Sequence, residues 1–482
     1  HIFDTEIGYA DHPTNGRQRR LIELSRILFR ADDLTSLLPL GRLEPLALAG
    51  ESYQLAFTGA LLDHVYRRAG RRLLPDQPGV LAVAGTAADR GGYVSSAMLA
   101  ADGRFPAHDV VDGWWQPGGR VYLSPDSTDT PTEELSYALG HFFLPHRTRD
   151  AFHTKAVSTE STVAYDEHQL LPVETRDALG NRVTVGERRA DGTVDPGRPG
   201  NDYRVLQPAL VTDPNRNRTQ VAFDALGMVV GTAVMGKRGQ QVGDSLAGFV
   251  ADLDEAVALA HLTNPVDRPN EILGRATTRL VYDLSAYRRT KFDDEPQPVS
   301  VHSLQRETHD AELASGVTSR VQHSISYGDG FGREIQKLVL AEPGPVDAGG
   351  PTVRPRWTRS GWTVFNNKGK PVRQYEPAFS ATHRFEFGVE VGVSAVLFYD
   401  PMERVVATLH PNETYDKVVF DPWQQVTWDV NDTVSNVPQD DPDIAGYVAG
   451  YLAGSGAQGW IGWRNRRVGA DGETVSSVAR SL

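Results

Sequence analysis

The segment of this sequence that comes closest to a metal-binding motif begins at Asp213. In the calcium loop of helix–loop–helix proteins, oxygen ligands stand at positions 1, 3, 5 and 12. Asp213 and Asn215 match the first two, and Asp224 falls at the last. The sixth position, which needs glycine for a sharp turn, is Arg218. No flanking helices are indicated, so we expect no calcium here but a turn followed by a strand over Thr219–Phe223.

Three other motifs suggest phosphate binding or catalysis, and each lacks a required part. The glycines of Gly328–Gly332 would suit a phosphate loop only before a helix, whereas Arg333–Leu340 alternates like a strand. Gly243–Gly248 has one residue too many for the turn that carries a hydrolase nucleophile. His141 and His146 lack the glutamate and the spacing of a zinc-protease helix. We expect no catalytic residue, no metal and no cofactor, and therefore no enzyme.

Composition excludes further classes of site and partner. The 482 residues include no cysteine, which removes disulfides, Cys-ligated zinc, iron–sulfur clusters and thiol nucleophiles. With 49 Lys and Arg against 62 Asp and Glu, the net charge is -13, so we expect no nucleic-acid partner. No stretch approaches the ~20 apolar residues of a membrane helix, so we expect no direct membrane insertion.

Two kinds of hydrophobic pattern, one helical and one strand-like, alternate along the chain. Leucines spaced by three and four predict a helix over Arg17–Arg30. Thr130 and Glu133 form a capping-box pattern that leads into a predicted helix over Leu135–Phe143. A third helix is expected over Asp244–His261. Most of the remaining sequence alternates apolar and polar residues in short runs, which predicts strands.

A short unit recurs through the strand-like parts of the sequence. It consists of an aromatic or apolar residue, Asp or Asn, two further residues and Gly. The carboxylate or amide closes an Asx turn, and glycine supplies a positive φ, so each unit is expected at a hairpin tip. Four copies end in glycine and two lack it; the residues concerned are Asp177 and Gly180, Asp224 and Gly227, Asp329 and Gly332, Asn366 and Gly369, then Asp400 and Asp421. We interpret all ten as structural turn residues and predict positive φ at the four glycines.

The unit resembles the YD repeat of Rhs proteins. Three longer strings are similar to the B component of insecticidal toxin complexes (Tc toxins): Asn201–Lys237, Trp362–Phe387 and Val396–Asp432. The resemblance covers nearly the whole chain and is strongest between Leu135 and Asp432. It implies a hollow shell of spiralled β-sheet, built by the B component with a C-type Rhs subunit, that encloses a cytotoxic effector. In that family a propeller gates the shell and docks on the A component, which injects the effector. Nothing in this sequence matches the propeller, and the self-cleaving aspartate belongs to the C component.

The expected fold is therefore mainly β with helical insertions, a YD/Rhs-repeat sheet that spirals as part of a shell. Residues 1–134 are a mixed α/β lead-in, residues 135–432 the repeat region with a helical insertion at about 244–263, and residues 433–482 a C-terminal segment. Because the chain begins at His1 without an initiating methionine or a signal peptide, we expect a fragment of a longer, secreted or extracellular protein.

The expected function is structural: a virulence-associated wall segment that helps encapsulate the effector, with a C-type subunit and an A-component pore as partners. One alternative is a secreted β-rich carbohydrate-active or glycan-binding protein, in which Trp114 and Trp115 could stack on sugars. Another is an Rhs wall of a different toxin-delivery system. An enzyme would need converging acids with perturbed pKa values in a cleft, whereas a wall needs none. Exposed strand edges would make the isolated chain self-associate.

Overall fold

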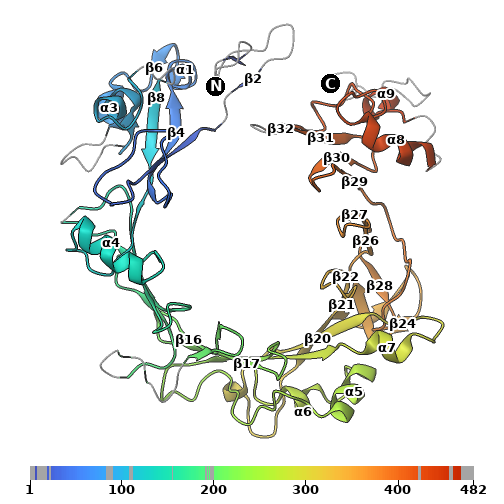
Figure 1. Ribbon diagram of the computed structural model, residues 1–482. Coiled ribbons are helices and arrows are strands. Elements are labelled where there is room, and N and C mark those ends of the chain that lie inside the picture. The colour runs from blue at the N-terminus through green and yellow to red at the C-terminus, as the bar shows by residue number, and fades with distance from the viewer. Residues whose placement is uncertain are drawn as a thin grey trace. The chain divides into compact units, whose positions relative to one another are not determined.

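The structure, a computed structural model, describes residues 6–7, 19–20, 23–82, 91–107, 112–154, 156–189, 193, 195, 200–421, 425–454 and 460–467. The chain is mainly β and divides into two compact units, shown as ribbons in Figure 1. Unit 1 comprises His1–Gln220 and Gly236–Gln240, and unit 2 comprises Val221–Met235 and Gln241–Leu482. The segment bounds expected at residues 134 and 432 stay predictions.

Unit 1 begins with a small antiparallel sheet in the strand order β3-β4-β8-β7. Its strands are β3 Ser25–Phe29, β4 Ala49–Thr58, β7 Val94–Ser95 and β8 Gly113–Pro117. Three short helices accompany it: α1 Gly59–His64, α2 Gln77–Leu81 and α3 Ser96–Ala101. Trp115 is fully buried in the core, and its indole N–H donates to the Ser96 hydroxyl at 2.8 Å. Trp115 is thus a packing residue with no face free to stack on a sugar.

The helix predicted over Arg17–Arg30 is wrong, because Ser25–Phe29 forms strand β3. Arg26 and Leu28 lie opposite Tyr53 and Glu51 of β4 in an antiparallel register. A spacing of four residues, as between Leu24 and Leu28, fits a period of two as well as one of 3.6. Pairing with the ten-residue strand β4 decides in favour of the strand.

A second antiparallel run in unit 1 follows the chain order from β9 to β17. Its strands are β9 Arg120–Tyr122, β10 Arg147–Arg149, β11 Ser161–Tyr165, β12 Pro172–Arg176, β13 Arg182–Val185, β16 Leu210–Thr212 and β17 Arg218–Phe223, whose residues 218–220 belong to this unit. Three two-stranded pairs stand apart: β1 Glu6–Ile7 with β2 Arg19–Arg20, β5 Arg67–Arg68 with β6 Arg71–Arg72, and β14 Asn201–Asp202 with β15 Gln207–Pro208. Most neighbours in the run from β9 to β17 are joined by local hairpins, whereas α4 lies between β9 and β10, and β14 and β15 lie between β13 and β16.

Helix α4, Pro131–Gly140, lies between β9 and β10 and starts with the expected capping box. The Thr130 hydroxyl accepts from the Glu133 backbone N–H at 3.3 Å, and the Glu133 carboxylate accepts from that of Thr130 at 2.8 Å. The next residue, Glu134, is buried and receives two bonds of 3.0 Å from the Arg30 guanidinium. This bidentate pair fixes α4 to the chain just after β3.

Unit 2 contains a long antiparallel run with helices inserted between its strands. The strands are β18 Val229–Met235, β19 Thr278–Asp283, β20 Val299–Arg306, β21 Val321–Gly328, β22 Glu334–Ala341, β25 Arg356–Arg359 and β28 Ala378–Ser380. The insertions are α5 Glu255–Thr263, α6 Pro269–Leu273, α7 Ala286–Thr290, a 3-10 turn Asp310–Glu312, and the pair β23 Gly344–Pro345 with β24 Thr352–Val353. β22 fulfils the prediction of a strand after Gly328–Gly332.

The helix predicted over Asp244–His261 is correct only in its C-terminal half. Helix α5 starts after Asp254, whose carboxylate accepts from the Ala256 backbone N–H at 2.9 Å. The preceding residues 244–254 are irregular, with a turn at 247–248, and Asp244 is buried in a polar cluster rather than placed on a helix face. The insertion expected at about 244–263 is thus helical from residue 255.

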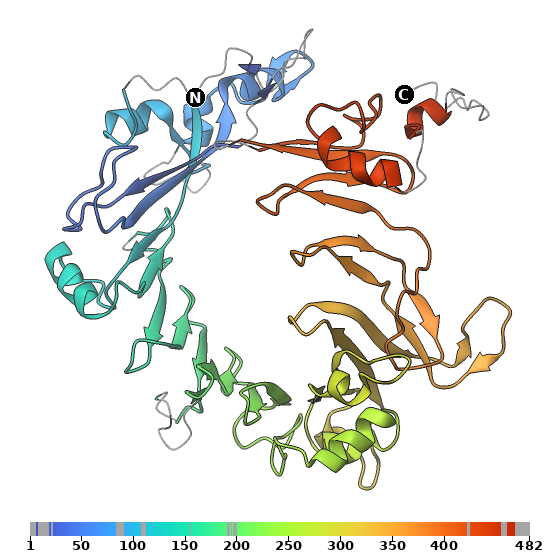
Figure 2. The same cartoon turned by 45° about the vertical axis from the view of Figure 1, so that its right-hand side comes forward.

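The last sheet of unit 2 has the order β26-β27-β29-β30-β31-β32. Its strands are β26 Thr363–Phe365, β27 Pro371–Gln374, β29 Val396–Tyr399, β30 Val405–Leu409, β31 Tyr415–Phe420 and β32 Gln425–Trp428. Helix α8, Ala445–Gly454, packs Val448 and Leu452 against Leu409 and Tyr415 of this sheet (Figure 2), and α9 spans Trp463–Arg467. The predicted fold class, mainly β with helical insertions, is confirmed as open antiparallel sheets. Across the described ranges, no helix has both the length and the apolarity needed to cross a bilayer.

Candidate functional site

The recurring Asp-x-x-Gly unit forms the tip of a β-hairpin. Between β12 and β13, the Asp177 carboxylate accepts from the backbone N–H groups of Leu179 and Asn181, both at 2.9 Å. Gly180 has φ +86°, a conformation that side chains with a Cβ resist. Bonding from the Asn181 side chain is the first cause that holds the pKa of Asp177 below its usual value. The turn is therefore stabilised by the ionised form of the aspartate.

The same geometry recurs at the other copies that end in glycine. Asp224, Asp329 and Asn366 each accept from the backbone N–H groups two and four residues on, at 2.8–3.3 Å. They close the hairpins β17–β18, β21–β22 and β26–β27. Gly227, Gly332 and Gly369 have φ between +81° and +83°. These values agree with the positive φ predicted from the sequence.

Two of the predicted turn residues stand in copies without glycine. Asp400 closes the β29–β30 hairpin by accepting from Met402 and Arg404, both at 2.9 Å, and Glu403 takes the positive φ of +66°. Bonding to the Arg404 backbone N–H is the first cause that lowers the pKa of Asp400. Asp421 follows β31, and the turn expected after it, residues 422–424, lies outside the described residues.

Two further turns have this geometry, and the sequence reasoning did not recognise them as copies of the unit because neither contains glycine. The first, at Asp213, was expected as a turn, and the strand expected after it over Thr219–Phe223 is part of β17. Asp213 accepts from the Asn217 backbone N–H at 2.7 Å, and Arg216 adopts φ +69° in the place of glycine. The former calcium candidate is thus a hairpin turn between β16 and β17. His410 and Glu413, with φ +63°, form the corresponding turn between β30 and β31. Proline directly after the first residue is the signal that could have identified both turns.

Three neighbouring turns in unit 2 contact one another. The Arg333 guanidinium lies over the Phe365 ring, and the Lys368 ammonium donates to the Pro401 carbonyl at 3.1 Å. Lys370 and Glu403 form an ion pair of 3.2 Å. The turns at Asp329, Asn366 and Asp400 therefore form a row, yet each carboxylate or amide bonds within its own turn. The predicted residues do not converge on a centre that could perform a reaction.

Four of the turns have an exposed apolar side chain one residue before the glycine position, whereas the Asn366 turn has Lys368 there. These side chains are Leu179, Leu226, Phe331 and Met402, which are 89%, 73%, 86% and 74% exposed. Leu179 lies in unit 1 and the other three in unit 2. Single exposed apolar side chains are common on protein surfaces, so their exposure alone assigns these four residues no role.

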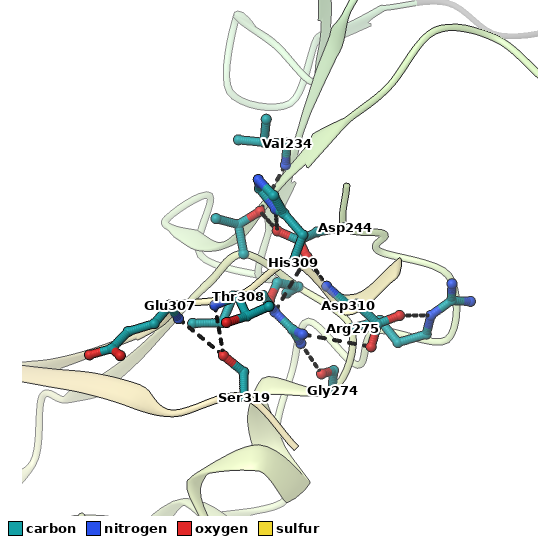
Figure 3. Close-up of polar contacts among 12 residues, drawn as sticks. Val234, Asp244, Gly274, Arg275, Glu307, Thr308, His309, Asp310 and Ser319 are labelled. Atoms are coloured by element: carbon teal, nitrogen blue, oxygen red, sulfur yellow. Dashed lines mark hydrogen bonds and ion pairs between the residues drawn. The ribbon is translucent and has the colours of Figure 1, made fainter. Parts of the chain in front are cut away.

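A buried polar cluster around Asp244 is the arrangement in unit 2 that most resembles catalytic machinery (Figure 3). The carboxylate accepts from the Thr277 hydroxyl, from His309 Nδ1 at 2.8 Å and from the Asp310 backbone N–H at 2.7 Å. Arg306 approaches it at 3.5 Å. An aspartate that orients a histidine is half of a nucleophile-activating triad.

The other half of such a triad is absent from the described residues. No hydroxyl among them is hydrogen-bonded to the second ring nitrogen of His309. The nearby Ser319 hydroxyl instead accepts from the backbone N–H groups of Glu307 and Thr308 and donates to the Arg320 carbonyl. The cluster thus holds the turns before α5 against the loop after β20.

Four histidines form a second buried cluster in unit 2, which the sequence reasoning did not identify. His261 on α5 lies 5.6 Å from His302 on β20, and His302 lies 6.4 Å from His383, measured between ring centroids. Burial lowers the pKa of His261 to about 4, that of His302 to about 3 and that of His323 to about 4. Over the described ranges, no group of three or more His, Asp or Glu side chains is arranged to hold a metal ion.

Comparison with known structures gives the fold a precedent. A crystal structure of TcdB2-TccC3 matches 85% of this chain at 20% sequence identity with a TM-score of 0.50. A crystal structure of TcdB2-TccC3-Cdc42 matches 87% at 19% identity, also with a TM-score of 0.50. The chain has the fold of a segment of TcdB2-TccC3. A chain of the Photorhabdus luminescens Tc holotoxin pore matches 86% at 17% identity with a TM-score of 0.47.

The likeness to these Tc toxin structures concerns a part of a much larger protein. The chain spans 17% of the matched TcdB2-TccC3 chain and 20% of the matched chain in the complex that includes Cdc42. No protein-family model and no curated protein sequence matches it.

Proposed function

We propose that the chain is a wall segment of a Tc-type toxin shell. In this proposal it belongs to a B component that, with a C-type Rhs subunit, encloses a cytotoxic effector and passes it to a pore-forming A component. The observation that carries the proposal is the fold shared with TcdB2-TccC3 over 85% of the chain. Because the chain spans 17% of that protein, its role is that of one stretch of wall.

The connectivity of the sheets supports a wall function. In both units most neighbours in a sheet are neighbours in the chain, so the sheet grows one hairpin at a time. Each strand's backbone N–H and C=O groups pair sideways with the next strand, which leaves few free for an unfolded cargo to pair with. A sheet of this kind, spiralling as the resemblance implies, would isolate an effector from proteases and other proteins.

A non-enzymatic role is supported by the electrostatics of the acidic side chains. Where the pKa of a described carboxyl group departs from its usual value, the departure is downward, as at Asp177, Asp400 and Asp441. A general acid at neutral pH needs the opposite shift. These carboxylates close turns or pair with cations; Asp441, for example, bonds the Lys417 ammonium at 2.7 Å.

Encapsulation is tested by protease protection. The full-length protein that contains this chain is co-expressed with a C-type subunit carrying its effector region, and the purified complex is treated with a broad protease. We expect the effector to survive in the complex and to be degraded when the C-type subunit is expressed alone. Equal degradation rates in the two samples would contradict a wall function. Binding of the complex to an A component then separates the Tc-type shell from an Rhs wall of another delivery system.

A further inference from the structure

We propose that a cationic pocket in unit 1 binds a compact polyanion that carries several phosphate or sulfate groups. The cavity has a volume of 830 Å³ and lies between the turns at Gly180 and Asp213 and the chain at Glu187 and Lys237. Of its fifteen lining residues in the described part of the chain, seven are Arg or Lys and two are acidic. In a chain of net charge -13, such a concentration of positive charge stands out.

Part of this positive charge is held in place by ion pairs with carboxylates, of which that of Glu187 is buried. Arg218 donates to Glu187 at 2.7 Å and to the Gly236 carbonyl at 3.0 Å. The side chains of Arg218 and Glu187 are 15% and 4% exposed, so this pair is fixed by its surroundings. Arg188 pairs with Glu174, whose side chain is more exposed, at 24%. Guanidinium groups oriented beforehand lose little entropy when an anion binds to their remaining N–H donors.

Two further cations on the rim have no acidic partner among the described residues. Arg216, whose φ is +69°, lies at the tip of the Asp213 turn, and Lys237 lies just after β18. Both side chains belong to exposed residues that line the cavity. Among the described residues, the acids that pair with the lining cations are Glu174, Glu187 and Asp195. Together with Asp213 they place four negative charges against seven positive ones, a surplus of three within that part of the chain.

The lining also indicates the class of ligand. The guanidinium fork matches the oxygens of phosphate and sulfate, and 830 Å³ lies in the usual range of roughly 300–1,000 Å³ for small-molecule sites. The described lining residues include no aromatic side chain on which a nucleobase could stack. A ligand that consists mainly of oxyanions, such as an inositol polyphosphate or a highly sulfated sugar, therefore fits better than a nucleotide.

Titration calorimetry of the full-length protein that contains this chain tests this inference, with myo-inositol hexakisphosphate as the phosphate probe and sucrose octasulfate as the sulfate probe. We expect one-site binding of at least one probe, weakened about tenfold or more in the double variant Arg216→Ala/Lys237→Ala, because two charge-assisted contacts are lost. Arg288→Ala/Lys291→Ala, which removes the same charge from exposed residues in unit 2, is the matched control and should bind like the original chain.

The two probes also distinguish the ligand's chemistry. If the phosphate probe binds more tightly, the pocket prefers phosphate groups; if the sulfate probe does, it prefers sulfate groups. Circular dichroism checks that both double variants are folded. The inference is overturned if neither probe binds at low salt, or if the two double variants weaken binding equally. The protease-protection experiment does not depend on this pocket, so either proposal can fail alone.

Discussion

The Arg333 guanidinium carbon lies 4.7 Å from the centre of the Phe365 ring, across two hairpins of unit 2. Arg333 also pairs with Asp329 within its own turn. One side chain thus closes one hairpin tip and packs against the next. Because Lys368 then contacts Pro401 of the following tip, the row of turns is coupled by side chains as well as by the sheets.

The positive φ at the turn glycines predicts that adding a side chain there lowers the stability of the fold. Gly332 has φ +83° and nothing within 4 Å of an added Cβ, so the cost of Gly332→Ala is one of backbone strain alone. We expect it to lower the free energy of unfolding by about 1–2 kcal/mol in urea denaturation. Gly140→Ala at the end of α4, where φ is not positive and space is equally open, should cause no loss. Equal effects at the two positions would contradict the turn assignment.

The turn carboxylate is predicted to act as a hydrogen-bond acceptor, so an amide should replace it. Asn366 already performs the same task as Asp224. We expect Asp224→Asn to leave the melting temperature nearly unchanged, whereas Asp224→Ala removes two bonds and costs about 1–2 kcal/mol. Thermal denaturation of both variants checks this. A loss in Asp224→Asn as large as in Asp224→Ala would indicate that charge matters more than the turn.

The buried histidines predict that unit 2 loses stability in acid. Their folded pKa values lie below the ordinary value of 6.5, so the unfolded chain binds more protons. The stability that these histidines contribute while neutral is therefore fully present above pH 6.5 and is lost progressively as the pH falls toward 4. For a nearly fully buried side chain such as His302, the expected loss at pH 5 is about 2 kcal/mol.

Urea denaturation between pH 5 and 6.5 measures this loss. The slope of the unfolding free energy against pH measures how many protons the chain takes up on unfolding. In His302→Met this number should be smaller by close to one. His168→Met, which alters an exposed histidine in unit 1, is the control and should keep the original slope. An unchanged slope in His302→Met would show that His302 does not titrate on unfolding.

The Asp213 turn is predicted to bind no calcium. Both oxygens of its carboxylate already accept from Asn217, from the backbone N–H at 2.7 Å and the side-chain amide at 3.1 Å. Arg216 and Arg218 stand in the same segment and would repel a cation. Calorimetric titration with calcium should give no stoichiometric heat at micromolar affinity. A one-site isotherm that is lost in Asp213→Ala would disprove this.

Local signals explain what the sequence could predict. The turns at Asp177, Asp224, Asp329 and Asn366 depend on residues within five positions, and so does the capping box of Thr130. The same locality explains why the turns at Asp213 and His410 were not recognised as copies of the unit, because Arg216 and Glu413 adopt a conformation usually left to glycine. Ser25–Phe29 became a strand only through pairing with β4, a contact between distant residues.

The two buried clusters of unit 2 could not be predicted because their members come from widely separated elements. His261, His302, His323 and His383 lie on a helix, two strands and a loop, and no spacing in the sequence links them. Asp244 was expected on a helix, but the structure places it in an irregular segment, where it bonds to Thr277 and His309. Burial of a polar group against distant partners overrides local helical periodicity.

The central claim, that the chain is wall rather than an independent domain, is tested most directly by cryo-electron microscopy. The sample is the full-length protein containing this chain, co-purified with its C-type subunit. The account predicts a hollow particle in whose wall the hairpins at Asp177, Asp329 and Asp400 are continuous with neighbouring strands. It also predicts that the exposed tips, Leu179, Phe331 and Met402, contact protein. A particle without a cavity, or density in which this chain forms a separate domain with solvent around those tips, would contradict it.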